Sequence, residues 1–204
     1  MKKHLHQVAL ILGALVILNS CATSSLSKSE RKSVTAISKE PGTSCFVKMN
    51  DGSIKNYTTL KLVTGPFKSP YLLADGKVKI KANQITAYQN DKHYAISQAT
   101  FCCGRKSKVA TETLPGFAVR TAKGKLNVYC KKYFNGQVAV DEFFLQAGDD
   151  GKVVAYTPEL LNELLKDNAD AIGFFNNKKF KGTLPEKLLA TAKMYNSGPL
   201  MTSN

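Results

Sequence analysis

Four of the five cysteines in the 204-residue chain are candidates for thiol chemistry: Cys45, Cys102, Cys103 and Cys130. The vicinal pair Cys102 and Cys103 is followed closely by Arg105 and Lys106, and nearby cations stabilise a thiolate. Redox chemistry at the pair is therefore one interpretation, although vicinal cysteines lack the C-x-x-C spacing. Two others stay open: a disulfide from one of the pair to Cys45 or Cys130 in an oxidising compartment, or inert thiols.

His93 is the single histidine beyond residue 20. One imidazole cannot build a histidine-rich zinc site, and a Ser-His-Asp triad would depend on it entirely. Because Asp91 and Lys92 precede it at a predicted turn, we interpret His93 as an ordinary surface histidine, with a catalytic base as the alternative.

Two pairs of acids are the other candidates for catalysis. Asp141 and Glu142 are neighbours on a predicted strand, where adjacent side chains point to opposite faces. Asp149 and Asp150 precede Gly151 in what is sufficiently explained as a hairpin turn. The chain contains no G-x-S-x-G, H-E-x-x-H, P-loop or G-x-G-x-x-G motif. We therefore expect no enzyme, no catalytic residue and no metal site.

Basic residues concentrate in residues 75–132, where twelve Lys and Arg stand against three acids, a local charge of +9. The candidate anion-binding residues are Lys77, Lys79, Lys81, Arg105, Lys106 and Lys131. Lys131 is next to the inward-facing Cys130 and is expected on the outer strand face. Such a face could bind anionic polymer or lipid headgroups. Lysines on an edge strand also prevent aggregation, and the residues favour this solvated-face interpretation.

The first 21 residues have the order of an export signal: two lysines, an uncharged run over residues 8–18, and then Leu18-Asn19-Ser20-Cys21. The run is too short to cross a hydrocarbon core, which needs about 20 helical residues. A cysteine after a small residue, with an aliphatic residue three positions before it, resembles the lipobox of bacterial lipoproteins. The resemblance implies cleavage before Cys21, a diacylglyceryl group on its thiol and an acyl chain on its amino group, with no other cofactor.

Removing residues 1–20 takes away two lysines and no acid, so the net charge falls from +14 to +12. Residues 21–43 comprise the lipidated cysteine and a Ser, Thr and Lys-rich stretch that we expect to be a flexible tether. Position 22 is alanine and no acidic run follows Cys21. Resemblance to known sorting signals therefore implies the outer membrane, with the chain on its periplasmic face. Since export removes the usual nucleic-acid targets, we expect no nucleic-acid partner.

Residues 44–156 consist of short alternating or β-branched runs separated by turn signals, which predicts strands. Residues 45–49 and 54–63 flank an Asp-Gly turn, and similar turns recur at residues 75–76, 123–124 and 150–151. We expect an antiparallel hairpin meander.

The period changes after residue 156. Thr157 and Pro158 predict the start of a helix, residues 167–175 could continue or restart it, and Thr183 opens another that Gly198 follows. Two or three C-terminal helices after a meander predict an α+β fold. We expect one domain over residues 44–198 and a disordered tail over residues 199–204.

The C-terminal half, in particular residues 126–129, 143–146, 161–168 and 195–196, weakly resembles uncharacterised exported proteins of Bacteroidota-type bacteria. That resemblance implies a location in the cell envelope but no particular catalytic activity. We therefore expect a membrane-tethered, non-enzymatic binding or structural module whose partner is an anionic lipid headgroup, an envelope polymer or another envelope protein. The alternative is an envelope enzyme, thiol-redox or hydrolytic, that uses Cys102 and Cys103 or His93.

Overall fold

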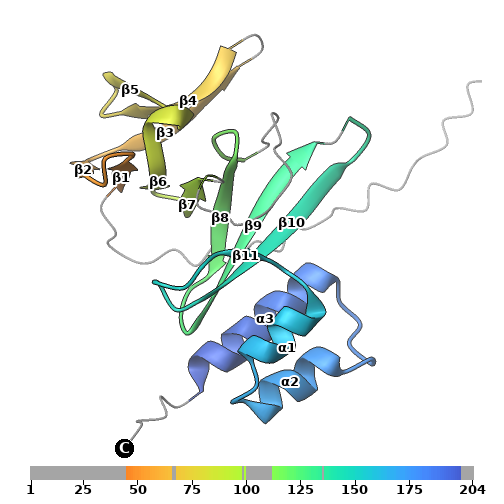
Figure 1. Cartoon of the computed structure of the whole chain (residues 1–204). Helices are drawn as coiled ribbons and strands as arrows, with labels where there is room; N and C mark the ends of the chain where they lie inside the picture. Colours follow the sequence, from red (N-terminus) through yellow and green to blue (C-terminus); the bar gives the residue numbers. More distant parts are fainter. Residues whose placement is uncertain (1–44, 66–67, 98, 100–111, 135, 199–204) are drawn as a thin grey trace, which may run out of the picture. The chain divides into compact units, whose positions relative to one another are not determined.

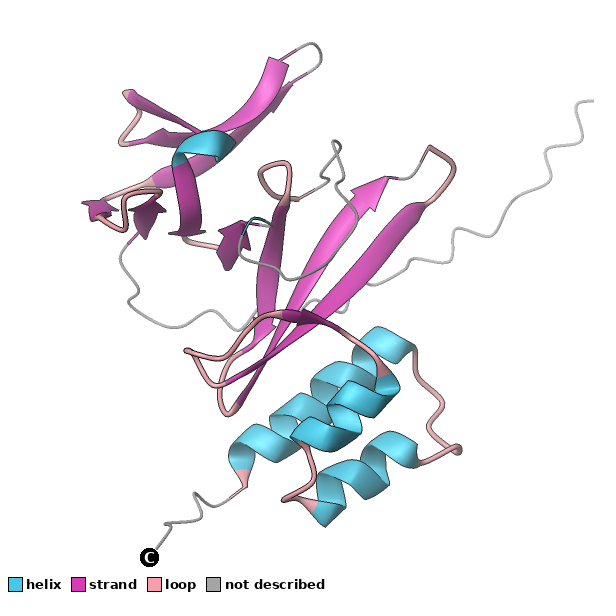
Figure 2. Cartoon of the chain, in the orientation of Figure 1, coloured by secondary structure: helices cyan, strands magenta, loops and turns pink. Residues whose placement is uncertain are grey.

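The computed structural model describes residues 45–65, 68–97, 99, 112–134 and 136–198 (Figure 1). Eleven strands precede three helices in these residues, so the predicted α+β arrangement of a β-meander with C-terminal helices is confirmed (Figure 2). All strand pairs are antiparallel, and the strands form an eight-stranded sheet, here sheet A, and a three-stranded sheet, sheet B.

Sheet A has the strand order β11-β10-β9-β8-β7-β6-β1-β2. Its strands are β1 (Cys45–Met49), β2 (Ile54–Tyr57), β6 (Ile85–Gln89), β7 (Tyr94–Ser97), β8 (Phe117–Ala122), β9 (Leu126–Phe134), β10 (Ala139–Ala147) and β11 (Val154–Ala155). Neighbours along the chain are mostly neighbours in the sheet, as in a meander. The exception is β1, which pairs with both β2 and β6.

Sheet B is the chain segment between β2 and β6. It consists of β3 (Leu60–Gly65), β4 (Lys68–Ala74) and β5 (Val78–Lys81), with β4 in the centre. A single 3-10 turn, Ala82–Gln84, leads from β5 into β6. Sheet B therefore interrupts the meander between two strands that both pair with β1.

The expectation of one strand over residues 54–63 is wrong. The chain leaves sheet A after Tyr57 and enters sheet B at Leu60. The side chain of Asp75, in the β4–β5 turn, accepts a hydrogen bond from the Thr59 backbone N–H at 2.8 Å. Leu60 itself is buried. The break thus depends on a partner sixteen residues away, which a local pattern cannot show.

The turn at Asp75 and Gly76 is the tight hairpin turn that the sequence predicts. Both residues have positive φ, 47° and 70°, and the Lys77 N–H donates to the Ala74 carbonyl at 3.0 Å. Positive φ at both central residues is the type I′ conformation, which matches the twist of the flanking strands. After β10 the detail differs from expectation, because the positive φ (59°) is at Gly148 and not at Gly151.

The helices begin where the capping residues predict. Helix α1 (Pro158–Leu164) is capped by Thr157, whose hydroxyl accepts from the Leu160 N–H. The chain restarts as α2 (Ala169–Asn176), and α3 (Leu184–Ser197) opens with a capping box between Thr183 and Glu186. Each cap satisfies backbone donors that the first turn leaves without partners.

One face of sheet A is covered along its length, as the strand register shows. A continuous row of register partners crosses the sheet: Val47, Tyr88, Ala95, Val119, Cys130 and Phe143. At the β1 end of the row, buried residues pack with Leu72 and Ile80 of sheet B, and at the β10 end they pack with helix residues such as Leu188. Sheet B and the helices therefore cover the same face of sheet A.

Candidate functional site

Two of the lysines that the sequence predicts for anion binding, Lys79 and Lys81, lie on one face of sheet B, together with Lys61, which the sequence did not single out. In register, Lys61 is opposite Leu73 and Leu73 is opposite Lys79, while Val63, Tyr71 and Lys81 form the next row. We call these six residues the basic face: Lys61, Val63, Tyr71, Leu73, Lys79 and Lys81. The alternate residues of the same strands, including Leu60 and Leu72, are buried against sheet A. The basic face is consequently the outer face of sheet B.

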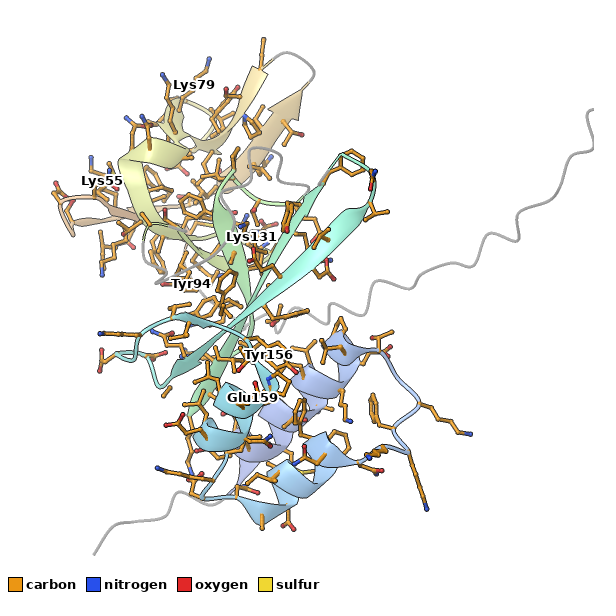
Figure 3. The ribbon with its side chains drawn as sticks, turned by 45° about the vertical axis from the view of Figure 1, so that its right-hand side comes forward. Lys55, Lys79, Tyr94, Lys131, Tyr156 and Glu159 are labelled. Carbon is orange, nitrogen blue, oxygen red and sulfur yellow. The ribbon has the colours of Figure 1, made fainter. Side chains whose placement is uncertain are left out.

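The three lysines of the basic face are exposed, whereas its three apolar members are half-buried. Lys79 Nζ lies 5.3 Å from the centroid of the Tyr71 ring, which stabilises the ammonium over the ring face. Figure 3 shows Lys79 extending outward from the ribbon of the sheet. Lys77 lies in the turn before β5 and adds positive charge at its edge.

Lys131 does not lie on an exposed face as expected. Its side chain is 2 % exposed, and its Nζ lies 3.0 Å from Oε2 of Glu142, its register partner on β10. Lys131 Nζ also lies 5.1 Å from the Tyr133 ring centroid. A buried, ion-paired lysine cannot meet a ligand in solution, so Lys131 is not part of the basic face.

Two of the four candidate cysteines, Cys45 and Cys130, are buried and free. Burial raises the pKa of both thiols, that of Cys130 to about 12, so both stay protonated near neutral pH. Their expected inward orientation is confirmed. Cys21, Cys102, Cys103, Arg105 and Lys106 lie outside the described residues.

The interpretation of His93 as a surface histidine is wrong. The residue is buried, at 7 % exposure, and its Nε2 lies 3.0 Å from the Tyr88 hydroxyl. Asn90 closes the turn by accepting hydrogen bonds from the backbone N–H groups of Lys92 and His93. Burial lowers the pKa of His93 to about 4. His93 is thus a neutral, internally bonded side chain.

Among the described residues, no interaction joins the two acidic pairs to each other or to His93. Glu142 pairs with Lys131, and Asp149 lies beside Arg120 at 3.9 Å. Within the described residues no group of three or more His, Cys, Asp or Glu side chains could hold a metal ion. In the same part of the chain, no helix has both the length and the apolar character needed to span a membrane.

A groove lies on the opposite face of sheet A, and the sequence did not predict it. It has a volume of about 480 Å³ and is lined by β1, β6, β7, β8, β9, β10 and the loop after β10. Its charged centre is Arg120 on β8, which the sequence marks only as one of many basic residues. Alternation along single strands cannot show which strands adjoin, and so cannot reveal a site built across six of them.

Comparison of the chain with protein-family models, with curated proteins and with solved structures gave no match in any of the three.

Proposed function

We propose that this chain is a bacterial envelope lipoprotein, anchored by acyl chains on Cys21 to the periplasmic face of the outer membrane. Its folded part is a non-enzymatic binding module that contacts anionic lipid headgroups through the basic face. The observation that carries the proposal is the convergence of Lys61, Lys79 and Lys81 from both edge strands of sheet B around Tyr71 and Leu73.

This distribution differs from what protection of a sheet edge requires. Lysines on β5 protect that edge, and protection of the β3 edge would explain Lys61, but neither requires apolar side chains between the lysines. Here Lys61 on β3, the other edge strand, joins them on the same face, and the central strand contributes half-buried apolar side chains between them. Cations around an apolar centre suit the interface of an anionic membrane, where ammonium groups meet headgroups and apolar side chains enter the boundary layer.

The expected strength is modest. A lysine near an anionic membrane surface contributes about 1 kcal/mol, so the three lysines together contribute about 3 kcal/mol. Such binding would be weak for a freely diffusing protein. A lipid tether on Cys21 would hold the basic face at a high effective concentration near the membrane, and weak contacts would then be enough.

The test uses the non-lipidated Cys21→Ser protein and vesicles with and without anionic lipid. Replacing Lys61, Lys79 and Lys81 together by glutamine should weaken binding to anionic vesicles by on the order of 100-fold at low salt. The matched control replaces three exposed lysines near or on the helices, Lys166, Lys178 and Lys193, by glutamine and changes the net charge equally.

The control variant should bind nearly as well as the unchanged protein, and vesicles without anionic lipid should bind neither. If both triple variants lost the same affinity for anionic vesicles, the loss would be due to net charge, and the basic face would not be a specific site. If the protein bound a soluble anionic polymer but not vesicles, its partner would be an envelope polymer and not a lipid headgroup.

A further inference from the structure

Small and apolar side chains form part of the lining of the groove on sheet A. Ala87 and Ile96 are buried register partners on β6 and β7, and Tyr129 of β9 lies in the same buried cluster. Phe46 and Tyr94 stand at the side, with ring centroids 6.2 Å apart. The volume of about 480 Å³ is within the range of roughly 300–1,000 Å³ that is typical of small-molecule sites.

Two β-bulges lie beside two of the cations that line the groove. The register between β1 and β6 shifts after Lys48, and the register between β8 and β9 shifts after Arg120. The extra residues are Thr86 and Thr121, whose hydroxyls donate to the backbone carbonyls of Lys48 and Val128. Bulges re-aim side chains and are frequent beside binding sites.

Arg120 is held in place before any ligand arrives. Its side chain is 15 % exposed, and its Cζ lies 4.4 Å from the Tyr94 ring centroid. A stacked guanidinium with five N–H donors is suited to bidentate pairing with a planar carboxylate. Asp149 lies 3.9 Å from Arg120 Nη1, beyond hydrogen-bonding distance, and its side chain is 67 % exposed.

The opposite wall, the loop after β10, is fixed by buried amides. Gln146 donates to the carbonyls of Asp149 and Gly151 at 2.9 and 2.8 Å and accepts from the Tyr129 hydroxyl at 2.8 Å. Asn127, which is 0 % exposed, donates to the Gly148 carbonyl at 2.7 Å and to Asp149 Oδ1 at 3.0 Å. The groove is therefore bounded by a rigid sheet and by a loop whose backbone is tied to it.

The lining carries four cations, Lys48, Arg120, Lys123 and Lys152, against one acid, Asp149. An anionic ligand fits this balance. Asp149 disfavours a doubly charged group at Arg120, since it places a negative charge beside the guanidinium; a single carboxylate is repelled less than a phosphate dianion.

We propose that this groove binds a carboxylate-bearing saccharide of about two rings. Its carboxylate displaces Asp149 from Arg120 and pairs with the guanidinium fork. Its rings lie over Ala87 and Ile96 beside Phe46, where the apolar faces of sugar rings contact the aromatic side chain and the hydroxyl groups remain near the polar rim. This site is separate from the basic face and does not depend on the membrane contact proposed for it.

The experiment is calorimetric titration of the Cys21→Ser protein with digalacturonate, with its neutral dimethyl ester and with inorganic phosphate. Digalacturonate should bind, the ester should bind at least about 10-fold more weakly, and phosphate should bind more weakly than digalacturonate. Arg120→Gln should weaken digalacturonate binding by about 10- to 100-fold, since charge-assisted hydrogen bonds are lost. Asp149→Asn should strengthen it by about 2- to 5-fold.

Lys48→Glu, at an exposed rim position, provides a second weakening variant that does not disturb packing, with an expected loss of at least about 3-fold. Circular dichroism and thermal melting establish that each variant is folded. The triple glutamine variant of the basic face should retain digalacturonate binding, whereas Arg120→Gln should retain vesicle binding. Absence of digalacturonate binding, equal binding of the ester, tighter binding of phosphate, or unchanged binding in folded Arg120→Gln and Lys48→Glu would overturn the proposal.

Discussion

At the scale of single residues, His93 couples the stability of the fold to pH. The imidazole is buried against the Tyr88 hydroxyl, and burial lowers its pKa to about 4, compared with about 6.5 for an unfolded chain. Between these values the unfolded chain binds a proton that the folded protein does not. Stability from this group is therefore fully present above about pH 6.5 and is lost as the pH falls toward 4.

We expect His93 to contribute about 3 kcal/mol to the loss of unfolding free energy between pH 7 and pH 4. Carboxylates also titrate in this range, so the measured quantity is the difference between the unchanged protein and His93→Gln in urea unfolding at each pH. The variant should lose about 3 kcal/mol less than the unchanged protein over the same interval. Identical pH dependence of the two proteins would show that folding does not change the pKa of His93.

The sequence predicted the burial of two cysteines but not the burial of Lys131 and His93. The inward orientation of Cys45 and Cys130 follows from alternation on their own strands, and it is confirmed. Burial of Lys131 and His93 depends on other segments: Glu142 on the next strand for Lys131, and the side chain of Tyr88 for His93. A single strand's pattern cannot distinguish an exposed polar face from a covered one.

At the scale of elements, the helices were predictable and the division into two sheets was not. Helix-capping residues act within one helical turn, so a local sequence pattern is enough to predict where a helix begins. The examples here are Thr157 with Pro158, and the capping box of Thr183 and Glu186. Strand pairing is not local. The single strand expected over residues 54–63 divides between two sheets because its halves find different partners, β1 and β4.

In addition to the apolar contacts of Leu188 and Ala192, the side chain of Asn196 joins α3 to sheet A by hydrogen bonds. Its Oδ1 accepts from the Leu126 N–H at 2.9 Å, and its Nδ2 donates to the carbonyls of Leu126 and Lys123 at 2.9 and 3.1 Å. Asn196→Ala should lower the unfolding free energy by about 2–3 kcal/mol, because a partly buried backbone donor loses its partner.

Urea unfolding at neutral pH measures this effect. The control is Asn162→Ala, which removes one exposed hydrogen bond between α1 and α2 and should cost less than about 1 kcal/mol. If the two variants lose the same stability, the Asn196 contacts do not hold the helix to the sheet.

At the scale of the whole molecule, the proposed anchor and the two surfaces have separable roles. Cys21→Ser should abolish lipid labelling and retention in the membrane fraction while the protein still folds, because residues 22–43 carry almost no large apolar side chain for packing. Fractionation and acyl labelling measure both effects, with Cys45→Ser as the control that should keep the anchor. Unchanged membrane retention of Cys21→Ser would contradict the lipoprotein interpretation.

The most direct test of the central claim is the environment of a fluorophore on the basic face when vesicles are added. Ser69 is exposed on β4 and lies two residues from Tyr71 of the basic face. A polarity-sensitive fluorophore is attached at Ser69→Cys, or at Lys178→Cys between the helices α2 and α3, in protein that carries Cys21→Ser, Cys102→Ser and Cys103→Ser. Burial and raised pKa values keep Cys45 and Cys130 unlabelled. Anionic vesicles at low salt should shift the emission of the label at position 69 to shorter wavelength, and high salt should reverse the shift. The emission of the label at position 178 should not change. A shift at position 178 without one at position 69 would contradict membrane contact through the basic face.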